Sequence, residues 1–488
     1  MKKLLVFSII INLAILPSGA VLSQTERVND TFLISVEDVR LIAISNNLEI
    51  KLAQLDSKIK GTDLGYKEAV FDTILNGEIG YTNDQRKSAS SFAGTKSITN
   101  EYNIGIDKKL RSGTDVEIDL TNSREWTDSA YVSTNPYHES QVEIGLTQPI
   151  AKNFFGLIDR GNIEIVKLEI RNAELDSYIK IENAIIDAEK AYWKFALATE
   201  EFKIKKEMLK KAIRLFNQYR RKLKIGLVET GDVLASEANM HVRGSELLLA
   251  SNELKSAEEL LRVHLNMKND LKLFPIDDLK GKEINADFTE SLNTAFENRR
   301  DYLSKKNDIE AKKVKLRMKK NSLFPEIDLN ATFATNGIDS RYSRALEDVY
   351  EDSNPKYYVG IEFKYPLENN EAESEHKKAT LEKTKAIINL QKTERQVISD
   401  VDEKFRNLSV NKINMSRMQR VENLQQGKLS QEEKRFKYGR SSSDTLIRYQ
   451  EDALNASLLT QRSYFDHRVA ILELMDAEDS FLKRVGLE

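Results

Sequence analysis

The sequence contains no cysteine in its 488 residues. Without cysteine the chain can form no disulfide framework and no thiolate metal site. It also lacks the cysteine that a bacterial lipoprotein carries at its mature N-terminus, so we expect no lipid anchor of that kind. The histidines are His138, His241, His264, His376 and His467, and they show no metal-ligand spacing. We therefore expect no metal and no cofactor.

A strong excess of charge is also missing. The net charge is −3, although 31% of the residues are charged. Nucleic-acid-binding proteins typically show a basic balance, so we expect no nucleic-acid partner. The sequence has no Gly-rich phosphate loop and no serine-nucleophile elbow. Its carboxylates usually stand near lysines, which is typical of solvated helix faces. We predict that the protein is not an enzyme.

Long apolar runs are confined to the N-terminus. Lys2 and Lys3 precede an apolar run at residues 4–16, and Pro17 and small residues follow it. This is the pattern of a secretory signal peptide, and it is shorter than the about 20 residues that a spanning helix needs. We predict a signal peptide at 1–23, cleaved after Ala20 or Ser23. The remaining sequence contains no candidate transmembrane helix, so a membrane location would require a β-barrel.

Proline is rare and unevenly placed. The seven prolines leave residues 150–274 and all residues after 366 free of proline. Proline is expelled from helix interiors because it lacks the N–H donor and clashes with the preceding turn. Two long stretches are therefore free to be helical, each broken once, at Gly226 and at Gly439.

The first of these stretches repeats with a period of seven. The apolar row comprises Ile181, Ala188, Phe195, Phe202, Leu209, Phe216 and Leu223, and an alanine-rich row lies three residues further on. A strict seven-residue period of this length predicts a left-handed supercoil against neighbouring helices. A helix from about 156 to 225 would be about 100 Å long, more than a compact globular domain needs.

The two halves of the mature sequence share one plan. Each contains a segment of aromatic and basic residues followed by a glycine, a polar turn and an aspartate, at 219–234 and 434–446. We predict a first repeat at 24–267, a linker at 268–288 and a second repeat at 289–488. The predicted strands occupy about 73–148 and 326–366. The predicted helical hairpins occupy about 156–267 and 369–486, with tips near 226–232 and 439–444.

Between the helical stretches, apolar residues follow a period of two. The alternating runs lie at 75–81, 102–106, 116–120, 142–146, 327–333 and 357–365. Each run has one apolar and one polar face, the weak signature of a transmembrane β-barrel, although a soluble antiparallel sheet is the alternative. The turn at 111–114 is tight, whereas 84–100, 124–138 and 336–356 are long polar connections. Short turns on one side and long loops on the other favour the outer-membrane arrangement.

One chain has too few strands to close a barrel, because the smallest closed barrels have about eight. Open strand edges cannot exist in lipid. We therefore expect several copies of the chain to share one barrel.

Taken in order, these features resemble the TolC family of outer-membrane efflux proteins over essentially the whole mature chain. The local motifs are Ser35-Val36-Glu37-Asp38 ahead of Asn46-Asn47, Gln148-Pro149-Ile150, Asn298-Arg299-Arg300-Asp301, Leu323-Phe324-Pro325, and the glycine turns from Gly226 to Leu234 and from Gly439 to Leu446. The implied fold is mainly α with a β-barrel portion, in two structural repeats of helix, strands and long helical hairpin. The assembly would be a trimeric transmembrane β-barrel continued by a periplasmic α-helical coiled-coil tube.

The resemblance also implies a function. It indicates a homotrimeric channel of the cell outer membrane that extends into the periplasm. Such a channel serves a tripartite efflux or type I secretion system and passively conducts substrates delivered by an inner-membrane pump and a periplasmic adaptor protein. The cargo is not indicated. The alternative is a periplasmic coiled-coil structural or adaptor protein, which would explain the signal peptide and the heptads but not the alternating segments.

The resemblance places the glycine turns at the periplasmic tip, where aspartate rings constrict the closed entrance of relatives. Asp444 matches such a position, whereas Ile447 stands where relatives may carry a second aspartate. Tyr438, Arg440, Glu229 and Asp232 lie in the two turns and are candidate latches between hairpins. From capping preferences alone, Gly226 and Gly439 are expected to end helices, and Asp232 and Asp444 to cap the next ones.

The number of strands in the barrel stays open. The first repeat has an insertion at about 85–123 that contains two alternating segments, 102–110 and 114–122. If both cross the membrane, each chain supplies six strands and a trimer has 18. If the extra hairpin lies outside the membrane, four strands per chain and 12 per trimer remain, as the resemblance implies.

Overall fold

The computed structural model describes residues 27–28, 31–87, 92, 94–268, 272–281, 286–351 and 354–486. The predicted signal peptide, residues 1–23, lies outside the described residues. The chain divides into two compact units, neither of which is contiguous in sequence. The helical unit comprises Met1–Ala53, Ile179–Asn298 and Ser399–Glu488, and the sheet unit comprises Gln54–Tyr178 and Arg299–Ile398. Each unit combines segments of both predicted repeats, so the repeats stay a prediction from sequence.

Two helices of 68 residues, α4 (Leu157–Lys224) and α9 (Asn370–Lys437), contribute to both units. They are followed by α5 (Thr230–Leu265) and α10 (Ser443–Ala477). Each proline-free stretch therefore folds as two long helices with one break, close to its glycine.

The helical unit also contains smaller elements. They are α1 (Val36–Asn46), α6 (Phe288–Asn298), α11 (Phe481–Arg484) and the strands β1 (Arg27–Val28), β2 (Thr31–Ile34) and β7 (Lys272–Pro275). Strand β2 pairs antiparallel with β1 and parallel with β7. Helix α1 begins with a capping box, in which the Ser35 N–H donates to Asp38 Oδ2 at 3.0 Å and the Asp38 N–H donates to Ser35 Oγ at 3.2 Å.

The seven-residue row supplies the core of the helical unit. Ala188 and Phe195 of α4 are buried in one cluster with residues of α1, α5, α10 and α11. Ile181, before these two residues, and Phe202 and Leu209, after them, are only partly buried. The single chain thus buries only Ala188 and Phe195 of this row fully.

Buried polar contacts fix the N-terminal segment on this core. The Tyr192 hydroxyl donates to Asp277 Oδ2 at 2.6 Å, and the same carboxylate oxygen accepts from the Val36 N–H at 2.7 Å. Burial and the Asp277 carboxylate raise the pKa of the Tyr192 phenol, which keeps it a donor. Arg40 forms a two-pronged ion pair with Glu189, with N–O distances of 2.7 and 3.0 Å.

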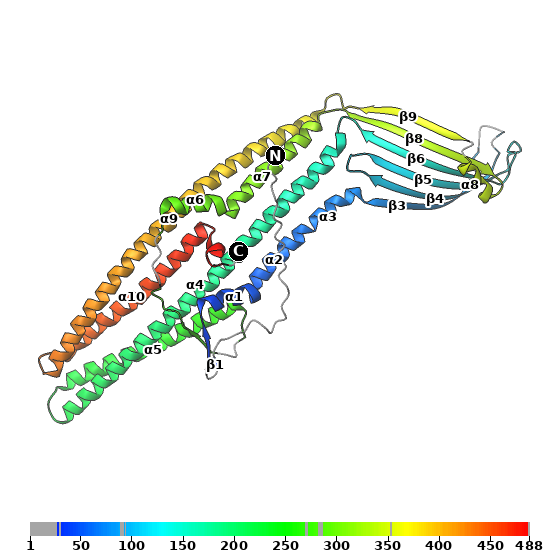
Figure 1. Cartoon of the computed structure of the whole chain (residues 1–488). Coiled ribbons are helices and arrows are strands. Elements are labelled where there is room, and N and C mark those ends of the chain that lie inside the picture. The colour runs from blue at the N-terminus through cyan, green and yellow to red at the C-terminus, as the bar shows by residue number, and fades with distance from the viewer. Residues whose placement is uncertain are drawn as a thin grey trace. The chain divides into compact units, whose positions relative to one another are not determined.

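The sheet unit is built on one antiparallel sheet. Its strands are β3 (Thr73–Asp84), β4 (Ser97–Lys109), β5 (Asp115–Thr127), β6 (Tyr137–Pro149), β8 (Glu326–Asp339) and β9 (Pro355–Lys364). They form one six-stranded sheet in the order β3-β4-β5-β6-β8-β9 (Figure 1). Strands β3 and β9 are its two edges. The strands are 10 to 14 residues long, and several extend beyond the predicted alternating runs.

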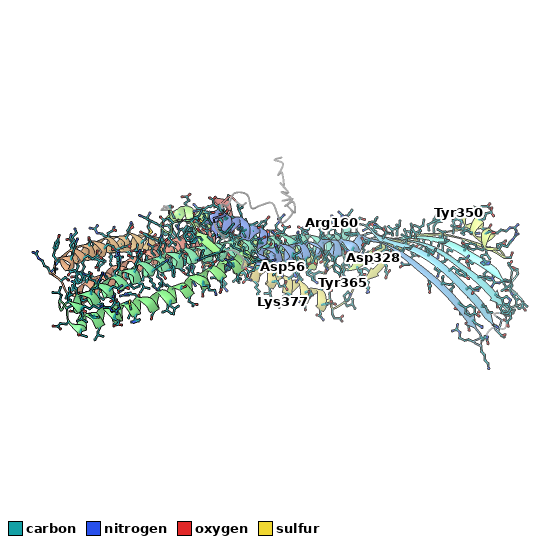
Figure 2. All side chains as sticks on the ribbon, turned by 90° about the horizontal axis from the view of Figure 1, so that it is seen from below. Asp56, Arg160, Asp328, Tyr350, Tyr365 and Lys377 are labelled. Carbon is teal, nitrogen blue, oxygen red and sulfur yellow. The ribbon has the colours of Figure 1, made fainter. Side chains whose placement is uncertain are left out.

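Helices adjoin one end of this sheet. They are α2 (Leu48–Gly61), α3 (Asp63–Glu68), η1 (Ala69–Phe71), η3 (Phe154–Gly156) and α7 (Arg300–Asn321), together with the first parts of α4 and α9. The tight β4–β5 turn lies at the same end, where the Leu110 N–H donates to the Thr114 carbonyl at 2.8 Å. We call this the helix end. Asp328 and Tyr365 lie toward it in Figure 2, whereas Tyr350 lies at the opposite end, here called the loop end.

One element at the loop end was missed by the sequence analysis. Residues 336–356 were predicted as a polar loop, but they contain the end of β8, the helix α8 (Tyr342–Tyr350) and the start of β9. The missed signal is the apolar spacing of Tyr342, Ala345 and Val349, which places one face of a helix against the sheet. Within the described parts of the chain, no helix is long and apolar enough to cross a membrane.

Candidate functional site

The two faces of the six-stranded sheet have opposite chemistry, and the strand register defines each face. One row of paired positions runs through Leu75, Ile106, Ile118, Ile144, Phe333 and Tyr357, one residue from each strand. Side chains two residues apart on a strand share a face. Leu75 therefore shares the apolar face with Ile79, and Tyr357 shares it with Ile361.

This apolar face is exposed to an unusual degree. Ile79 is 84% exposed, Ile361 is 68% exposed and Ile104 is 56% exposed. A water-soluble monomer rarely exposes a contiguous apolar patch larger than a few hundred Å². From Tyr357 to Phe363 the face spans six residue rises, or about 20 Å, close to the height of the apolar band of an outer-membrane barrel.

Aromatic side chains flank the apolar face at both ends. At the helix end, Phe154 and Phe155 are exposed and contact each other edge to face, with ring centroids 4.6 Å apart. At the loop end, Tyr131 and Tyr350 are exposed. Aromatic girdles of this kind lie at the two water interfaces of membrane barrels.

Helix α8 covers a limited part of the apolar face, over β6 and β8 at the loop end. Gly337 makes this contact possible, because a Cβ at this position would clash with the Ala345 carbonyl oxygen. Below the helix, the Asn122 amide donates to Ser140 Oγ at 2.7 Å. The apolar positions closer to the helix end stay uncovered.

The opposite face of the sheet is rich in carboxylates. By strand register it carries Glu78, Asp84, Glu101, Asp107, Asp115, Glu117, Asp119, Glu125, Glu139, Glu143, Glu326, Asp328 and Glu362, against Lys109, Lys356 and Lys364. Like charges on neighbouring strands repel each other unless water or counter-ions screen them. This face is therefore suited to an aqueous compartment that contains cations.

The helical unit contains the hairpin turns predicted as the periplasmic tip. We call residues 225–229 the first turn and residues 438–442 the second turn. Gly226 and Gly439 adopt left-handed φ values of 69° and 70°. The N–H of the residue after each glycine bonds back to the helix, Leu227 to the Lys222 carbonyl at 3.0 Å and Arg440 to the Arg435 carbonyl at 2.9 Å. This geometry terminates a helix and favours glycine.

The residues that begin the next helices differ from the expectation for Asp444. The N-cap of α10 is Ser442, whose hydroxyl accepts from the Thr445 N–H at 3.2 Å, whereas Asp444 lies exposed in the first helical turn. Asp232 lies three residues after Glu229, the N-cap of α5, and its carboxylate accepts from the Glu229 N–H at 3.4 Å. The cap prediction for Asp444 was wrong because a serine hydroxyl two residues earlier reaches the free N–H.

A hydrogen bond joins the two hairpins at their turns. The Ser443 hydroxyl donates to Asp232 Oδ1 at 2.8 Å. Beneath it, Leu215 and Tyr219 of α4 pack against Leu429 and Leu446, and Ile447 packs partly buried on the same cluster. The Asp232 carboxylate is therefore part of a contact within one chain.

Tyr438 and Arg440 project from the second turn. Tyr438 is 75% exposed, and Arg440 is also exposed. The structure does not pair either side chain with Asp444, Asp232 or Glu229. The predicted latch residues thus divide into Asp232, which holds two hairpins of one chain together, and the exposed Tyr438, Arg440 and Glu229. Asp444, the predicted ring residue, is also exposed.

The described residues contain no group of three or more His, Cys, Asp or Glu side chains arranged to hold a metal ion.

The contacts at the turns also include residues that the sequence analysis missed. Ser441 donates to the buried carboxylate of Glu432, which Arg435 also contacts at 3.3 Å. A serine-rich turn after the glycine was the available signal for these contacts.

Comparison with known proteins gives no match by sequence: no family model and no curated protein matches the chain. Solved structures do match. CusC superposes with a TM-score of 0.69, covering 94% of this chain and 95% of that chain at 14% identity. The CmeC outer-membrane channel of Campylobacter jejuni gives 0.66, covering 92% and 89% at 14% identity. The open state of the MtrE outer-membrane channel of Neisseria gonorrhoeae gives 0.66, covering 91% and 88% at 13% identity.

The chain has the fold of these outer-membrane channels. The resemblance predicted from the sequence is confirmed at the level of the fold, which is mainly helical with a sheet part. The outer-membrane channel fold covers both regions described above, because each superposition includes more than nine-tenths of the chain.

Proposed function

We propose that the protein is an outer-membrane channel that extends into the periplasm and serves a tripartite efflux or type I secretion system. The observation that carries this proposal is the apolar face of the six-stranded sheet, which α8 covers only over β6 and β8 at the loop end, with carboxylates on the opposite face. Lipid on one side and water on the other satisfy both faces at once. A periplasmic structural or adaptor protein would leave the apolar face in water.

The sheet also needs further copies of the chain. Strands β3 and β9 are edges, and their free backbone groups would be unsatisfied in lipid. Strand β3 runs from the helix end to the loop end and β9 runs back, so an antiparallel β3–β9 contact between copies can continue the sheet. A homotrimer is the assembly that the resemblance to the TolC family implies.

The hairpin turns are the proposed entrance and adaptor contact. The exposed side chains of Ile225, Leu227 and Tyr438 present apolar surface at the turns. We assign them to the contact with a periplasmic adaptor, which couples the channel to an inner-membrane pump. The channel itself conducts passively and needs no catalytic group.

Asp444 is the proposed selectivity residue of the entrance. Three copies of an exposed carboxylate around one axis would concentrate negative potential at a narrow mouth, which attracts cations and resists anions. Asp444→Ala should lower cation selectivity and block by multivalent cations while trimers still assemble. Asp452→Ala, which removes an acid that pairs with Lys428 at 2.9 Å, is the matched control and should leave selectivity unchanged.

The proposal as a whole is tested with purified protein in detergent and in planar lipid bilayers. We expect cross-linking to stop at three subunits, heat-modifiable trimers in outer-membrane fractions, and discrete conductance steps. A stable monomer that conducts would contradict the shared barrel. A water-soluble protein found only in the periplasm would favour the structural alternative.

A further inference from the structure

The β4–β5 hairpin is the part of the sheet whose role the sequence left open. It is not attached at an edge: β4 pairs with β3, and β5 pairs with β6. The β4–β5 ladder runs from Ser97↔Thr127 to Lys109↔Asp115 without interruption. Both strands have 13 residues, the same length as β6. The hairpin therefore lies inside the sheet over the full length of its neighbours.

The hairpin also continues both faces of the sheet. Ile106 and Ile118 lie in the same row as Leu75 on β3 and Ile144 on β6, and both are at least 40% exposed. The opposite face continues as well, with Asp107 paired to Glu117. A hairpin outside the membrane would expose its isoleucines to water, while the strands on either side of it were in lipid.

We infer that all six strands of each chain cross the outer membrane, so that three copies close an 18-stranded barrel. This inference rests on the proposed function. The closing contact is β9 of one copy against β3 of the next. On the carboxylate-rich face, β9 carries Lys356, Glu362 and Lys364, and β3 carries Glu78 and Asp84, so the two edges have opposite net charge on this face.

The added strands widen the duct. Barrel diameter grows about linearly with strand number, so 18 strands give about 1.5 times the diameter of 12 and about twice the cross-section. Barrels of 16–18 strands leave an aqueous channel through their centre. The barrel thus admits bulky hydrated cargo, such as a polypeptide or a large solute, and the hairpin turns become the narrower part of the path.

The absence of native cysteine allows a direct test with single cysteines. Ile104→Cys and Ile118→Cys report on the hairpin. Ile144→Cys on β6 and Ile361→Cys on β9 report on other strands of the sheet. Asn103→Cys and Thr121→Cys are matched controls on the opposite face of the hairpin. Each variant, reconstituted as a heat-modifiable trimer, carries an environment-sensitive fluorophore in vesicles that contain brominated lipid.

We expect quenching at Ile104→Cys and Ile118→Cys to match that at Ile144→Cys and Ile361→Cys within about twofold, and to exceed that at the controls several-fold, because apolar-face side chains of a barrel contact lipid. If the positions on β6 and β9 are quenched and the hairpin positions are not, the inference is wrong and the channel proposal stands. If none of the four is quenched, the channel proposal itself fails.

A second measurement replaces the quenching experiment where a labelled variant gives no fluorescence signal or does not assemble. The rate of reaction with a charged, membrane-impermeant thiol reagent should be about tenfold or more slower at the hairpin isoleucine positions than at the Asn103→Cys and Thr121→Cys controls, since a charged reagent is excluded from lipid. Equal rates on both faces of the hairpin would overturn the inference. Ile106→Cys and Leu120→Cys share the apolar face and replace any variant that does not form trimers.

Discussion

The helical unit buries its apolar residues in a core within one chain, whereas the sheet of the sheet unit leaves many of its apolar residues exposed. In the helical unit, apolar residues of α1, α4, α5 and α10 enclose one another, and Ile185 is fully buried. In the sheet unit, Ile79 of β3, Ile104 of β4 and Ile361 of β9 have no cover within the described chain and are more than half exposed. The helical core encloses its apolar residues within one chain, whereas the proposed function covers the sheet with lipid and with further copies of the chain.

The largest expected effect comes from matched isoleucine truncations in the two regions. Ile185→Ala should lower the free energy of unfolding by about 2–5 kcal/mol, because it leaves a cavity in a packed core. Ile361→Ala on β9 should lower it by less than about 1 kcal/mol for protein in detergent, since the side chain is already exposed. Chemical denaturation followed by circular dichroism measures both.

Equal losses in the free energy of unfolding for Ile185→Ala and Ile361→Ala would contradict the difference between the two regions. A large loss at Ile361→Ala in detergent would mean that a protein surface, rather than lipid, covers β9. The oligomeric state must be measured alongside, since an interface between copies would give the same loss.

The second prediction places a charge on each face of one strand. Ile118→Arg should oppose membrane insertion by about 2–4 kcal/mol per chain, the usual penalty for a cation at the lipid midplane of a barrel. Glu117→Arg, on the neighbouring residue and the opposite face, should insert and assemble normally. The yield of heat-modifiable trimers in the outer-membrane fraction measures the difference.

The cation selectivity of the Glu117→Arg channel is a second test of which face of the sheet is in water. Loss of a carboxylate and gain of a cation on the polar face should reduce cation selectivity. Failure of Glu117→Arg to assemble, with normal assembly of Ile118→Arg, would assign the two faces the other way round.

The third prediction concerns the contact between the turns, which a single chain completes by itself. Asp232→Ala and Ser443→Ala should each weaken it, and the double variant should be no worse than either alone. The expected coupling is about 0.5–1.5 kcal/mol, typical of one side-chain hydrogen bond. Thermal unfolding of the four proteins gives the coupling, and bilayer recordings show whether loss of the bond raises the open fraction. Strictly additive effects would show that Asp232 and Ser443 do not act together.

The sequence predicts this fold well where a period is long. The seven-residue row of α4 and the alternation in the strands persist over many residues, so helix, strand and buried face follow from spacing alone. It fails where a contact depends on three-dimensional proximity. The Ser443–Asp232 bond joins residues 211 positions apart, and no local pattern marks it.

Short elements and caps are the other failures. Helix α8 has nine residues, and its apolar spacing fills only two turns, so the polar composition around it dominated the prediction. At the start of α10, the run Ser441, Ser442, Ser443 and Asp444 offers four candidate caps, and propensity cannot choose among them. Backbone geometry selects Ser442.

The smallest expected effect lies in the helices that adjoin the sheet. Glu382 of α9 accepts from Lys315 at 2.9 Å and from Lys312 at 3.1 Å, both on α7. These lysines lower the pKa of the Glu382 carboxyl from 4.5 to about 2. Because the folded-state pKa is depressed, the stabilisation is complete above the unfolded-state pKa near 4.5 and is lost as the pH falls toward about 2.

Glu382→Gln should therefore lower the free energy of unfolding by less than about 1 kcal/mol at pH 7, because the pair is partly exposed to solvent. The difference from the unmodified protein should shrink between pH 4.5 and pH 2. Urea titrations of both proteins across this range measure it, and Lys315→Met should show the same pH dependence with a smaller amplitude. A difference that stays constant down to pH 2 would mean that Glu382 stabilises the helices by packing rather than by charge.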